Sequence, residues 1–265
     1  MVLNQIEGQE KTYGHVELKN VYVTLDSEKG EIDVLKDITL SLDKKKIYVM
    51  TGPNGSGKTS IAKAIMGIYP IARGQILFEG QDISKKGIAE RAQLGIGYAF
   101  QQPPRFKGLK VRDLLTLAAG QDDPARYCDL LYDVGLCAQD YMDREMNASL
   151  SGGEMKRIEI ASLLARNLKI ALFDEPEAGI DLWSFQRLTE TFETIHEKLD
   201  TSIVIISHQE RILSLADEVI MVKEGRISEI TTREKILGDI QRLDMECQFS
   251  VSGARGGKQD AGCNR

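Results

Sequence analysis

Apolar and polar residues alternate in two stretches near the start of the chain, at residues 16–23 and 38–42. A period of two residues turns one face of a segment toward the core and the other toward water. Strands with one solvated face are typical of antiparallel sheets. The pattern therefore predicts a small antiparallel sheet in the N-terminal region.

From residue 46 onward, short apolar runs are separated by stretches with apolar residues at helical spacing. The apolar runs, which predict strands, lie at residues 46–50, 75–80, 96–100, 170–173 and 202–206. The stretches with a spacing of three to four residues, which predict helices, lie at residues 60–68, 158–168 and 186–199. Buried strands that alternate with helices are typical of an α/β fold, with a mostly parallel sheet covered on both faces.

Between residues 101 and 147 the apolar residues recur only at helical intervals, which predicts a helical subdomain inserted in the sheet. Residues 241–265 form a C-terminal segment. From about residue 250 it is rich in Gly and polar residues, so we expect a disordered tail there. The predicted division is a core of residues 1–100 and 166–240, and a helical subdomain of residues 101–165.

The composition of the chain narrows the range of functions that it could have. The chain has 265 residues, 42% of them hydrophobic and 28% charged, as expected of a globular protein with one large core. Its formal net charge of −6 provides no positive field for a phosphate backbone, so we expect no nucleic-acid partner. The apolar runs are far shorter than the roughly 20 residues that span a bilayer. Because no secretion signal is evident either, we expect a cytoplasmic protein without direct membrane insertion.

A glycine-rich loop lies between a predicted strand and a predicted helix. Residues 52–59, Gly-Pro-Asn-Gly-Ser-Gly-Lys-Thr, fit the pattern G-x-x-x-x-G-K-[ST] at every position. Glycines let backbone N–H groups turn toward phosphate oxygens, and the following helix adds the positive end of its dipole. We expect Lys58 to reach the β and γ phosphates of ATP, and the Thr59 hydroxyl to bind Mg²⁺. The residues of this loop predicted to contact ATP are Gly52, Asn54, Gly55, Ser56, Gly57, Lys58, Thr59 and Ser60.

Two carboxylates follow the apolar run at residues 170–173. A strand that ends in Asp174 and Glu175 delivers both side chains to the same sheet edge as the phosphate loop. We expect Asp174 to hold Mg²⁺ through its hydration water and Glu175 to polarise the attacking water. Alone, such a pair also fits a solvated turn. Beside a phosphate loop, it predicts ATP hydrolysis.

The sequence Leu-Ser-Gly-Gly-Glu at residues 150–154 opens another helix. Its hydroxyl, backbone N–H groups and helix dipole would form a second anion cradle, although the same residues also fit an ordinary N-capped helix. One chain does not need two cradles for one γ phosphate. A dimer does, if Ser151 and Gly153 of each copy close over the ATP bound to the other. The motif therefore predicts an ATP-dependent homodimer.

These motifs occur in the order and approximate spacing of ATP-binding cassette ATPases, which the chain resembles over about residues 16–230. The resemblance implies a P-loop NTPase core with a small antiparallel subdomain and an inserted helical subdomain. It also implies that Gln101 touches Mg²⁺ and links the core to the helical subdomain, and that His208 contacts the γ phosphate. The implied catalytic residues are Glu175, His208, Lys58 and Gln101, and the implied metal ligands are Thr59, Gln101 and Asp174.

Two family features are altered in this sequence. Asp181, in Ala-Gly-Ile-Asp, resembles the D-loop residue, although the family more usually has Ser-Ala-Leu-Asp there. The family also stacks adenine on an aromatic residue near the end of the first strand. Here Tyr22 lies a few residues early and Leu25 is closer to the expected place. We therefore do not assign the adenine-stacking residue.

Three classes of cassette ATPase are possible: a subunit of a membrane transporter, a SufC-type ATPase of the Suf iron–sulfur cluster assembly machinery, and a nucleic-acid or ribosome-associated protein. The last class usually carries two cassettes in one chain, and this chain has one. Residues 150–159, LSGGEMKRIE, resemble the LSGGE-x-KR-x-E form of SufC, whereas Asp-Glu-Pro at residues 174–176 is common in transporters. The resemblance favours a SufC-type ATPase with a SufB-like scaffold as partner. Transporter membrane subunits are the alternative partner.

A further hypothesis concerns Lys156. Its charge and its place in the SufC-like motif suggest an ion pair with Glu175 in the resting monomer. An exposed, solvated lysine is the alternative.

Overall fold

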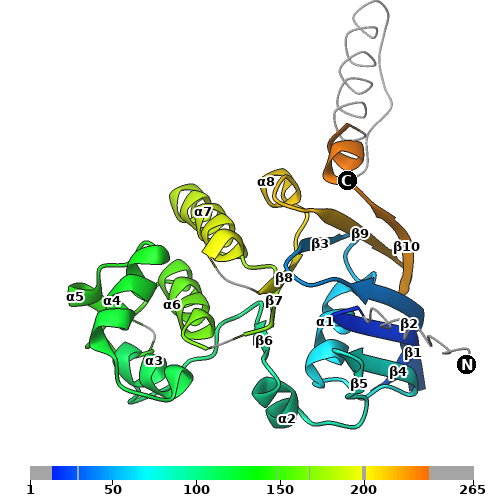
Figure 1. Ribbon diagram of the computed structural model, residues 1–265, viewed down its shortest axis with the longest axis horizontal. Coiled ribbons are helices and arrows are strands. Elements are labelled where there is room, and N and C mark those ends of the chain that lie inside the picture. The colour runs from blue at the N-terminus through cyan, green and yellow to red at the C-terminus, as the bar shows by residue number, and fades with distance from the viewer. Residues whose placement is uncertain (1–13, 29, 148, 167, 199–200, 239–265) are drawn as a thin grey trace, which may run out of the picture.

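The computed structural model describes residues 14–28, 30–147, 149–166, 168–198 and 201–238. The predicted C-terminal segment and its tail lie outside the described residues. Figure 1 shows an antiparallel sheet on one side, a parallel sheet in the middle and a lobe of helices on the other side. This arrangement is the predicted α/β fold, and it includes the small antiparallel sheet that was predicted for the N-terminal region.

The antiparallel sheet has the strand order β2-β1-β4-β5. Its two long strands pair along their whole length and are longer than the alternating pattern predicted, because their outer ends form a hairpin that extends beyond the core. The bounds are Val16–Ser27 for β1, Gly30–Leu42 for β2, Arg73–Phe78 for β4 and Gln81–Asp82 for β5.

The second sheet has the order β10-β9-β3-β8-β7-β6, in which all neighbours except β10 and β9 are parallel. Parallel strands carry their carboxyl ends to one edge, and that edge is where α/β proteins bind ligands. The bounds are Ile47–Thr51 for β3, Ile96–Ala99 for β6, Ile170–Asp174 for β7, Ser202–Ile206 for β8, Glu218–Lys223 for β9 and Arg226–Thr231 for β10.

Successive side chains of the central strands enter two different cores. In β3, Ile47 and Val49 belong to one core, whereas Tyr48 and Met50 belong to the other. This is the two-residue period of a strand that is buried on both faces. The sheet is therefore covered on both sides, as the continuous apolar runs predicted.

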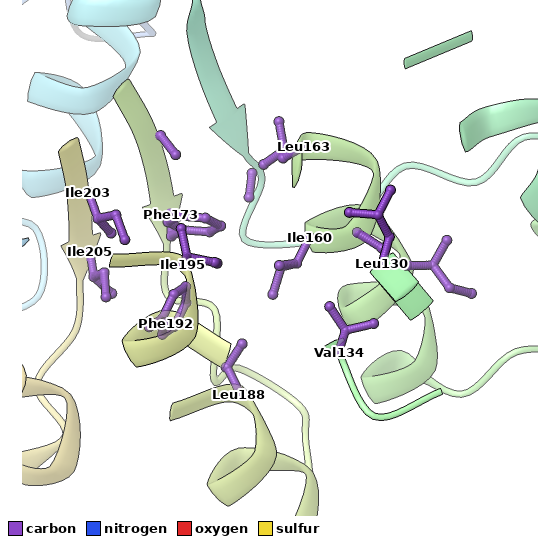
Figure 2. Close-up of a cluster of buried hydrophobic side chains, with 14 of the residues drawn as sticks. Leu130, Val134, Ile160, Leu163, Phe173, Leu188, Phe192, Ile195, Ile203 and Ile205 are labelled. Atoms are coloured by element: carbon purple, nitrogen blue, oxygen red, sulfur yellow. The ribbon is translucent and has the colours of Figure 1, made fainter. Parts of the chain in front are cut away.

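The helices lie on both faces of the parallel sheet and beyond its β6 edge. Figure 2 shows Phe173 of β7 against Phe192 of α7, and their rings meet edge-on with centroids 4.8 Å apart. The helices α3 to α6 form the lobe between β6 and β7 (Figure 1). The bounds are Lys58–Met66 for α1, Ile88–Gln93 for α2, Val111–Ala119 for α3, Pro124–Asp133 for α4, Ala138–Tyr141 for α5, Gly152–Leu164 for α6, Leu182–Lys198 for α7 and Glu210–Leu213 for α8.

All three helices that the apolar spacing predicted begin earlier than expected, and the difference is largest for α6 and α7. The helix expected at residues 158–168 begins at Gly152 and ends at Leu164. Ser151 caps its first turn, so the polar residues that follow the cap are helical although their pattern is not amphipathic. The helix expected at residues 186–199 begins at Leu182. The first turn of α6 is polar, which hides it from a hydrophobic pattern, whereas the first turn of α7 is mostly apolar.

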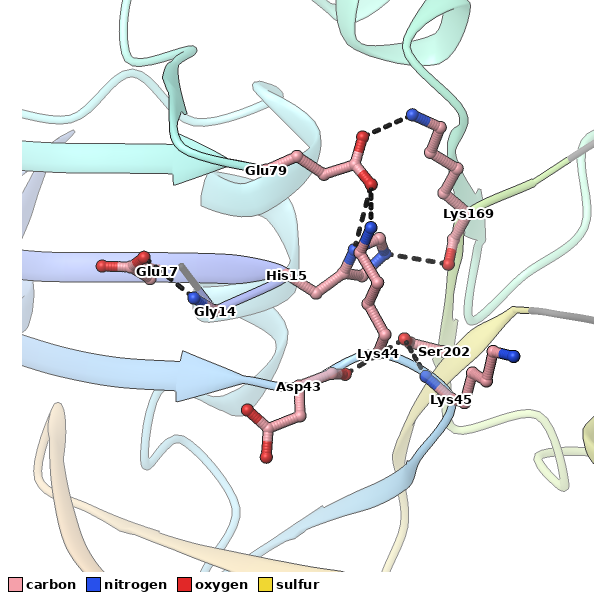
Figure 3. Close-up of polar contacts among 9 residues, drawn as sticks. All are labelled: Gly14, His15, Glu17, Asp43, Lys44, Lys45, Glu79, Lys169 and Ser202. Atoms are coloured by element: carbon pink, nitrogen blue, oxygen red, sulfur yellow. Dashed lines mark hydrogen bonds and ion pairs between the residues drawn. The ribbon is translucent and has the colours of Figure 1, made fainter. Parts of the chain in front are cut away.

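A buried histidine joins the antiparallel sheet to the amino edge of the parallel sheet (Figure 3). The His15 side chain is 3% exposed, and its Nε2 lies 3.0 Å from the carbonyl oxygen of Lys169, which precedes β7. The Glu79 carboxylate lies 3.8 Å from His15 Nδ1 and pairs with both Lys169 and Lys44. Hydrogen bonds from these two ammonium groups lower the pKa of Glu79 to about 2. Burial lowers the pKa of His15, against the opposing effects of the Lys169 carbonyl and Glu79.

Candidate functional site

The predicted site residues converge on the carboxyl edge of the parallel sheet. The phosphate loop follows β3, Gln101 follows β6, and Asp174 is the last residue of β7. His208 follows β8 by two residues. The sheet topology thus brings together segments that are up to about 150 residues apart in the chain, as ligand sites in α/β sheets require.

The phosphate loop turns where only glycine fits. Gly52 has a φ of 139°, and a Cβ atom there would lie 2.1 Å from the carbonyl oxygen of Val222. Gly57 has a φ of 106°, and its Cβ atom would lie 3.0 Å from Leu35 of β2. The pattern G-x-x-x-x-G-K-[ST] therefore reflects close backbone packing of this loop against β9 and β2.

The Lys58 ammonium lies inside the loop. It donates hydrogen bonds to the carbonyl oxygens of Gly52 at 2.8 Å and Pro53 at 2.9 Å. Burial lowers the pKa of Lys58, while the nearby Glu175 and Asp174 carboxylates oppose this effect. The lysine is thus held at the centre of the loop, where a phosphate would meet its charge.

The hydroxyl of Ser56 is buried without a hydrogen-bond partner among the described residues. The residue is 4% exposed, and its backbone is fixed because its carbonyl accepts a hydrogen bond from Gly225 at 2.8 Å. Buried hydroxyl groups are nearly always paired in native proteins. An unpaired one in a glycine-rich loop beside a buried lysine fits a site for phosphate oxygens.

Asp174 is held by two hydroxyl groups. Thr59 Oγ1 donates to Asp174 Oδ1 at 2.8 Å, and the Tyr98 phenol donates to Asp174 Oδ2 at 2.7 Å. Burial and the hydrogen bond with Asp174 raise the pKa of Tyr98, which keeps the phenol protonated. Sequence reasoning missed Tyr98. The only signal was a tyrosine in the predicted strand at residues 96–100.

Oxygen atoms suited to Mg²⁺ therefore lie together at this edge. Mg²⁺ prefers oxygen ligands and is usually held by one or two protein groups together with phosphates and waters. The Thr59 hydroxyl and the Asp174 carboxylate provide such a pair. No group of three or more His, Cys, Asp or Glu side chains that could hold a metal occurs in the described part of the chain. The donor set fits magnesium bound with a nucleotide.

Glu175 occupies a strained backbone position. Its φ of 42° is in the left-handed region, and its N–H donates to the Ile206 carbonyl at 3.0 Å. A non-glycine residue in this region costs of order 1–3 kcal/mol and is commonest at functional sites. The turn aims the carboxylate at Gln101, whose Nε2 donates to Glu175 Oε2 at 2.5 Å. The two residues predicted to act on water and metal are thus in direct contact.

A cavity of about 650 Å³ surrounds these groups. Gln101 and Glu175 line it together with β2 and the turn after β9. From the phosphate loop it is lined by Asn54, Gly55, Ser56, Gly57, Lys58, Thr59 and Ser60. The remaining lining residues are Ile32, Asp33, Val34, Lys36, Glu224 and Gly225. The volume is in the range of small-molecule sites.

Tyr22 is outside this cavity. Its ring packs against the guanidinium of Arg73, at 4.3 Å from the ring centroid. Leu25 packs against the core that contains Tyr48 and Met50. The apolar residues that line the cavity are Ile32, which is 50% exposed, and the half-buried Val34. Among the described residues the cavity wall contains no aromatic side chain.

Ser151 and Gly153 are not brought to the phosphate loop of their own chain, because neither lines the cavity. Ser151 is exposed and caps α6: its Oγ accepts a hydrogen bond from the Glu154 N–H at 3.2 Å, and its own N–H donates to the Glu154 carboxylate at 2.6 Å. The motif thus forms a capped helix N-terminus at the surface. Gly153 is buried within the first turn of this helix.

His208 is exposed and likewise does not line the cavity. It lies near Glu177, a carboxylate that sequence reasoning missed and that accepts a hydrogen bond from the Ser207 hydroxyl. Burial raises the pKa of Glu177, against the effects of the Ser207 hydrogen bond and the His208 charge. Asp181 is exposed just before α7.

The hypothesis of a Lys156–Glu175 ion pair is wrong in this structure, and so is the alternative of a solvated lysine. Lys156 is 1% exposed. Its ammonium lies 3.2 Å from Glu159 Oε2 and donates to the Phe100 carbonyl. Because α6 packs against the end of β6, Lys156 points toward that strand end. The partner of Glu175 is Gln101 instead.

In a comparison with known families, the model of the ABC transporter family matches residues 35–178. Among curated proteins, the "Uncharacterized ABC transporter ATP-binding protein MJ0035" of Methanocaldococcus jannaschii is 36% identical over 75% of this chain and 83% of its own length. The "Probable ATP-dependent transporter ycf16" of Pyropia yezoensis is 32% identical over 80% of this chain and 89% of its own length. The "Sulfate/thiosulfate import ATP-binding protein CysA" of Mesorhizobium japonicum is 32% identical over 76% of this chain and 60% of its own length.

Solved structures with the same fold include the dimeric ATP-binding cassette MJ0796 in a post-hydrolysis state bound to ADP and Pi. It matches with a TM-score of 0.74 and 22% identity, over 82% of this chain and 98% of that one. CbiO1 from Clostridium perfringens, part of the cbiONQ transporter complex, matches with a TM-score of 0.72 and 24% identity, over 88% of this chain and 94% of that one. Within the described ranges, no helix is long and apolar enough to cross a membrane.

Proposed function

Since the chain belongs to the ABC transporter family, we propose that it is a cytosolic ATPase in which two copies enclose two molecules of MgATP between them. The observation that carries this proposal is the separation of its two anion cradles. The phosphate loop lines a cavity, whereas Ser151 caps a helix outside it and is exposed. A second copy would complete the site by placing its Ser151 and Gly153 over the γ phosphate.

Within one chain the groups divide the chemistry as follows. Lys58 and the loop N–H groups bind the phosphates, and Thr59, Asp174 and Gln101 would hold Mg²⁺. The ion would neutralise charge on the transferred phosphoryl group. Glu175 orients the attacking water and accepts its proton, and its contact with Gln101 sets the direction of the carboxylate. His208 reaches the γ phosphate only after a movement, because in this structure it lies outside the cavity.

The adenine base rests on aliphatic side chains in this proposal. Ile32 and Val34 of β2 provide the apolar surface of the cavity, whereas the Tyr22 ring packs against the Arg73 guanidinium. An aliphatic wall contacts a base without the face-to-face stacking of an aromatic ring. Nucleotide affinity then depends mainly on the phosphates.

The partner that we propose is a SufB-like scaffold of iron–sulfur cluster assembly. The residues that favour it are Lys156 and Glu159, which distinguish the SufC-like form of the sequence at residues 150–159, called the signature motif below. Both are buried and paired rather than exposed, so this form of the motif has a structural role in the chain. In this role ATP-driven closure of the dimer would change the shape of the scaffold, and the cluster would be its cargo.

The second candidate is the nucleotide-binding subunit of a membrane transporter. It is favoured by the names of relatives such as the sulfate/thiosulfate import protein, and by Pro176 after the two carboxylates. Both candidates use the same ATPase cycle. They differ only in what contacts the helical lobe.

The two candidates are separated by stimulation of ATP hydrolysis with purified partners. The genes next to that of this chain provide the partners, and the measured quantity is phosphate release by this chain with and without each one. The proposal predicts stimulation by a SufB-like protein in the absence of lipid. Stimulation only by a multi-span membrane protein in detergent or vesicles would replace it with the transporter function.

A further inference from the structure

The signature helix α6 carries a buried ion pair. Lys156 and Glu159 lie one turn apart on this helix, with side chains only 1% and 9% exposed. Their charged groups are 3.2 Å apart. Isolated charges this deep in a protein are strongly disfavoured, so each of these side chains requires its partner.

The pair holds both backbone polar groups of Phe100. The Phe100 N–H donates to Glu159 Oε1 at 2.9 Å, and the Phe100 carbonyl accepts a hydrogen bond from the Lys156 ammonium. Hydrogen bonds with a charged partner are roughly twice as strong as neutral ones. Phe100 is the first residue beyond β6, so the pair fixes the chain where it leaves the sheet.

The hydrogen bond between Lys156 and the Phe100 carbonyl fixes the backbone position of Gln101. The carbonyl of Phe100 is one half of the peptide group that joins it to Gln101, and a peptide group is planar. When Lys156 fixes the carbonyl, it also fixes the N and Cα atoms of Gln101. The side chain of Gln101 then reaches Glu175.

Stability alone does not account for two buried charges at these positions. Replacing a buried ion pair with apolar residues of similar volume is often neutral or stabilising. Charged hydrogen bonds offer direction, because they fix the donor and acceptor relative to each other. The ion pair is therefore suited to holding the backbone at Phe100 in one position.

The same helix begins at the signature motif. Ser151 caps α6, and Lys156 and Glu159 follow within the next two turns of one continuous helix. A displacement of Ser151 therefore moves the ion pair as well. Contacts thus run from Ser151 through α6 and Phe100 to Gln101 and Glu175.

We propose that Lys156 and Glu159 are positioning residues, which couple the place of the signature helix to the contact between Gln101 and Glu175. Hydrolysis in one site then depends on the position of the same chain's signature motif over the ATP of the other copy. This inference rests on the proposed catalytic role of Glu175.

The test is a double-mutant cycle on ATP hydrolysis by the full chain. The first variant, Lys156→Met with Glu159→Met, removes both charges and keeps the volume. We expect kcat to fall about tenfold while KM changes less than about twofold, because misplacement of a catalytic group affects the transition state. The matched control is Arg187→Met with Glu190→Met, an exposed pair with the same spacing on α7, which should hydrolyse ATP at the wild-type rate.

The second half of the cycle repeats the Met pair in a Gln101→Ala background. If the ion pair acts through Gln101, it should change kcat less than about twofold there, because its only route to Glu175 is already absent. An equal fall in both backgrounds would overturn the proposal, and so would an unchanged kcat in the wild-type background. Should the Met pair not fold, Lys156→Met with Glu159→Gln replaces it in both arms. This variant removes both charges and the Lys156 bond to the Phe100 carbonyl, while the glutamine oxygen can still accept the buried Phe100 N–H.

The Glu175→Gln variant is measured in the same assay. If it hydrolyses ATP at the wild-type rate, the catalytic role of Glu175 fails. If it is inactive and the cycle is additive, only the positioning role fails.

Discussion

Tyr98 and Asp174 form a buried hydrogen bond between two neighbouring strands, with the phenol oxygen 2.7 Å from Asp174 Oδ2. Thr59 occupies the other carboxylate oxygen. The carboxylate therefore has a fixed direction before any nucleotide or metal binds.

The Tyr98→Phe variant removes only the phenol oxygen. It leaves a buried carboxylate oxygen without its partner, which costs about 1–3 kcal/mol. We expect the free energy of unfolding of the nucleotide-free protein, measured by urea denaturation, to fall by this amount. Tyr132→Phe is the control, because Tyr132 is 81% exposed. Equal unfolding free energies for Tyr98→Phe and the wild type would show that the bond does not hold Asp174.

The Ile32→Tyr variant tests the aliphatic base site. An aromatic ring on this wall could stack on adenine, which is worth about 1–3 kcal/mol and corresponds to an affinity increase of about fivefold or more. Titration calorimetry with MgATP measures the change in Kd. Tyr22→Leu should leave Kd unchanged, since Tyr22 lies outside the cavity. A weaker ATP affinity in Tyr22→Leu would show that the adenine base contacts Tyr22 instead.

The pH dependence of stability tests the buried His15. Burial lowers its pKa in the folded chain, so the unfolded chain binds the proton more readily. The stability due to the neutral histidine is thus complete above the unfolded value of 6.5 and is lost as pH falls through the lower folded value. Glu79 acts in the same direction only at lower pH, because its stability is lost between the ordinary pKa of 4.5 and the folded pKa of about 2.

The measurement is the free energy of unfolding at pH 7.5 and pH 5.5 for the wild type and His15→Gln. We expect the wild type to lose more stability than the variant on acidification, because glutamine does not titrate. An equal loss in wild type and His15→Gln would contradict the account of this site.

The phosphate loop and the two carboxylates could be predicted because their chemistry is local in the sequence. Gly52 and Gly57 must be glycines for the loop to turn, and a buried strand delivers Asp174 to the same edge. The fold class followed from continuous apolar runs that alternate with stretches of helical spacing, which is the pattern of a parallel sheet covered on both faces.

Most of the contacts that the sequence did not reveal are made between distant segments, although the Lys156–Glu159 ion pair lies within one helix. A tyrosine in an apolar strand gives no sign that its phenol reaches Asp174, since this depends on how β6 and β7 are packed. A lysine in a helix is normally solvated, and Lys156 is buried only because α6 lies against Phe100. Tyr22 could be set aside from its spacing, but Ile32 could be found only from the cavity.

The shared active site is the central claim, and light scattering on Glu175→Gln tests it most directly. This variant should bind MgATP without hydrolysing it. The ATP-bound dimer should therefore accumulate, with twice the 29.5 kDa mass of the chain. Adding Ser151→Arg should block closure and leave a monomer that still binds MgATP, since Ser151 lies outside its own chain's cavity. If Glu175→Gln saturated with MgATP stays monomeric, or if the Ser151→Arg combination dimerises equally well, two copies do not share the site.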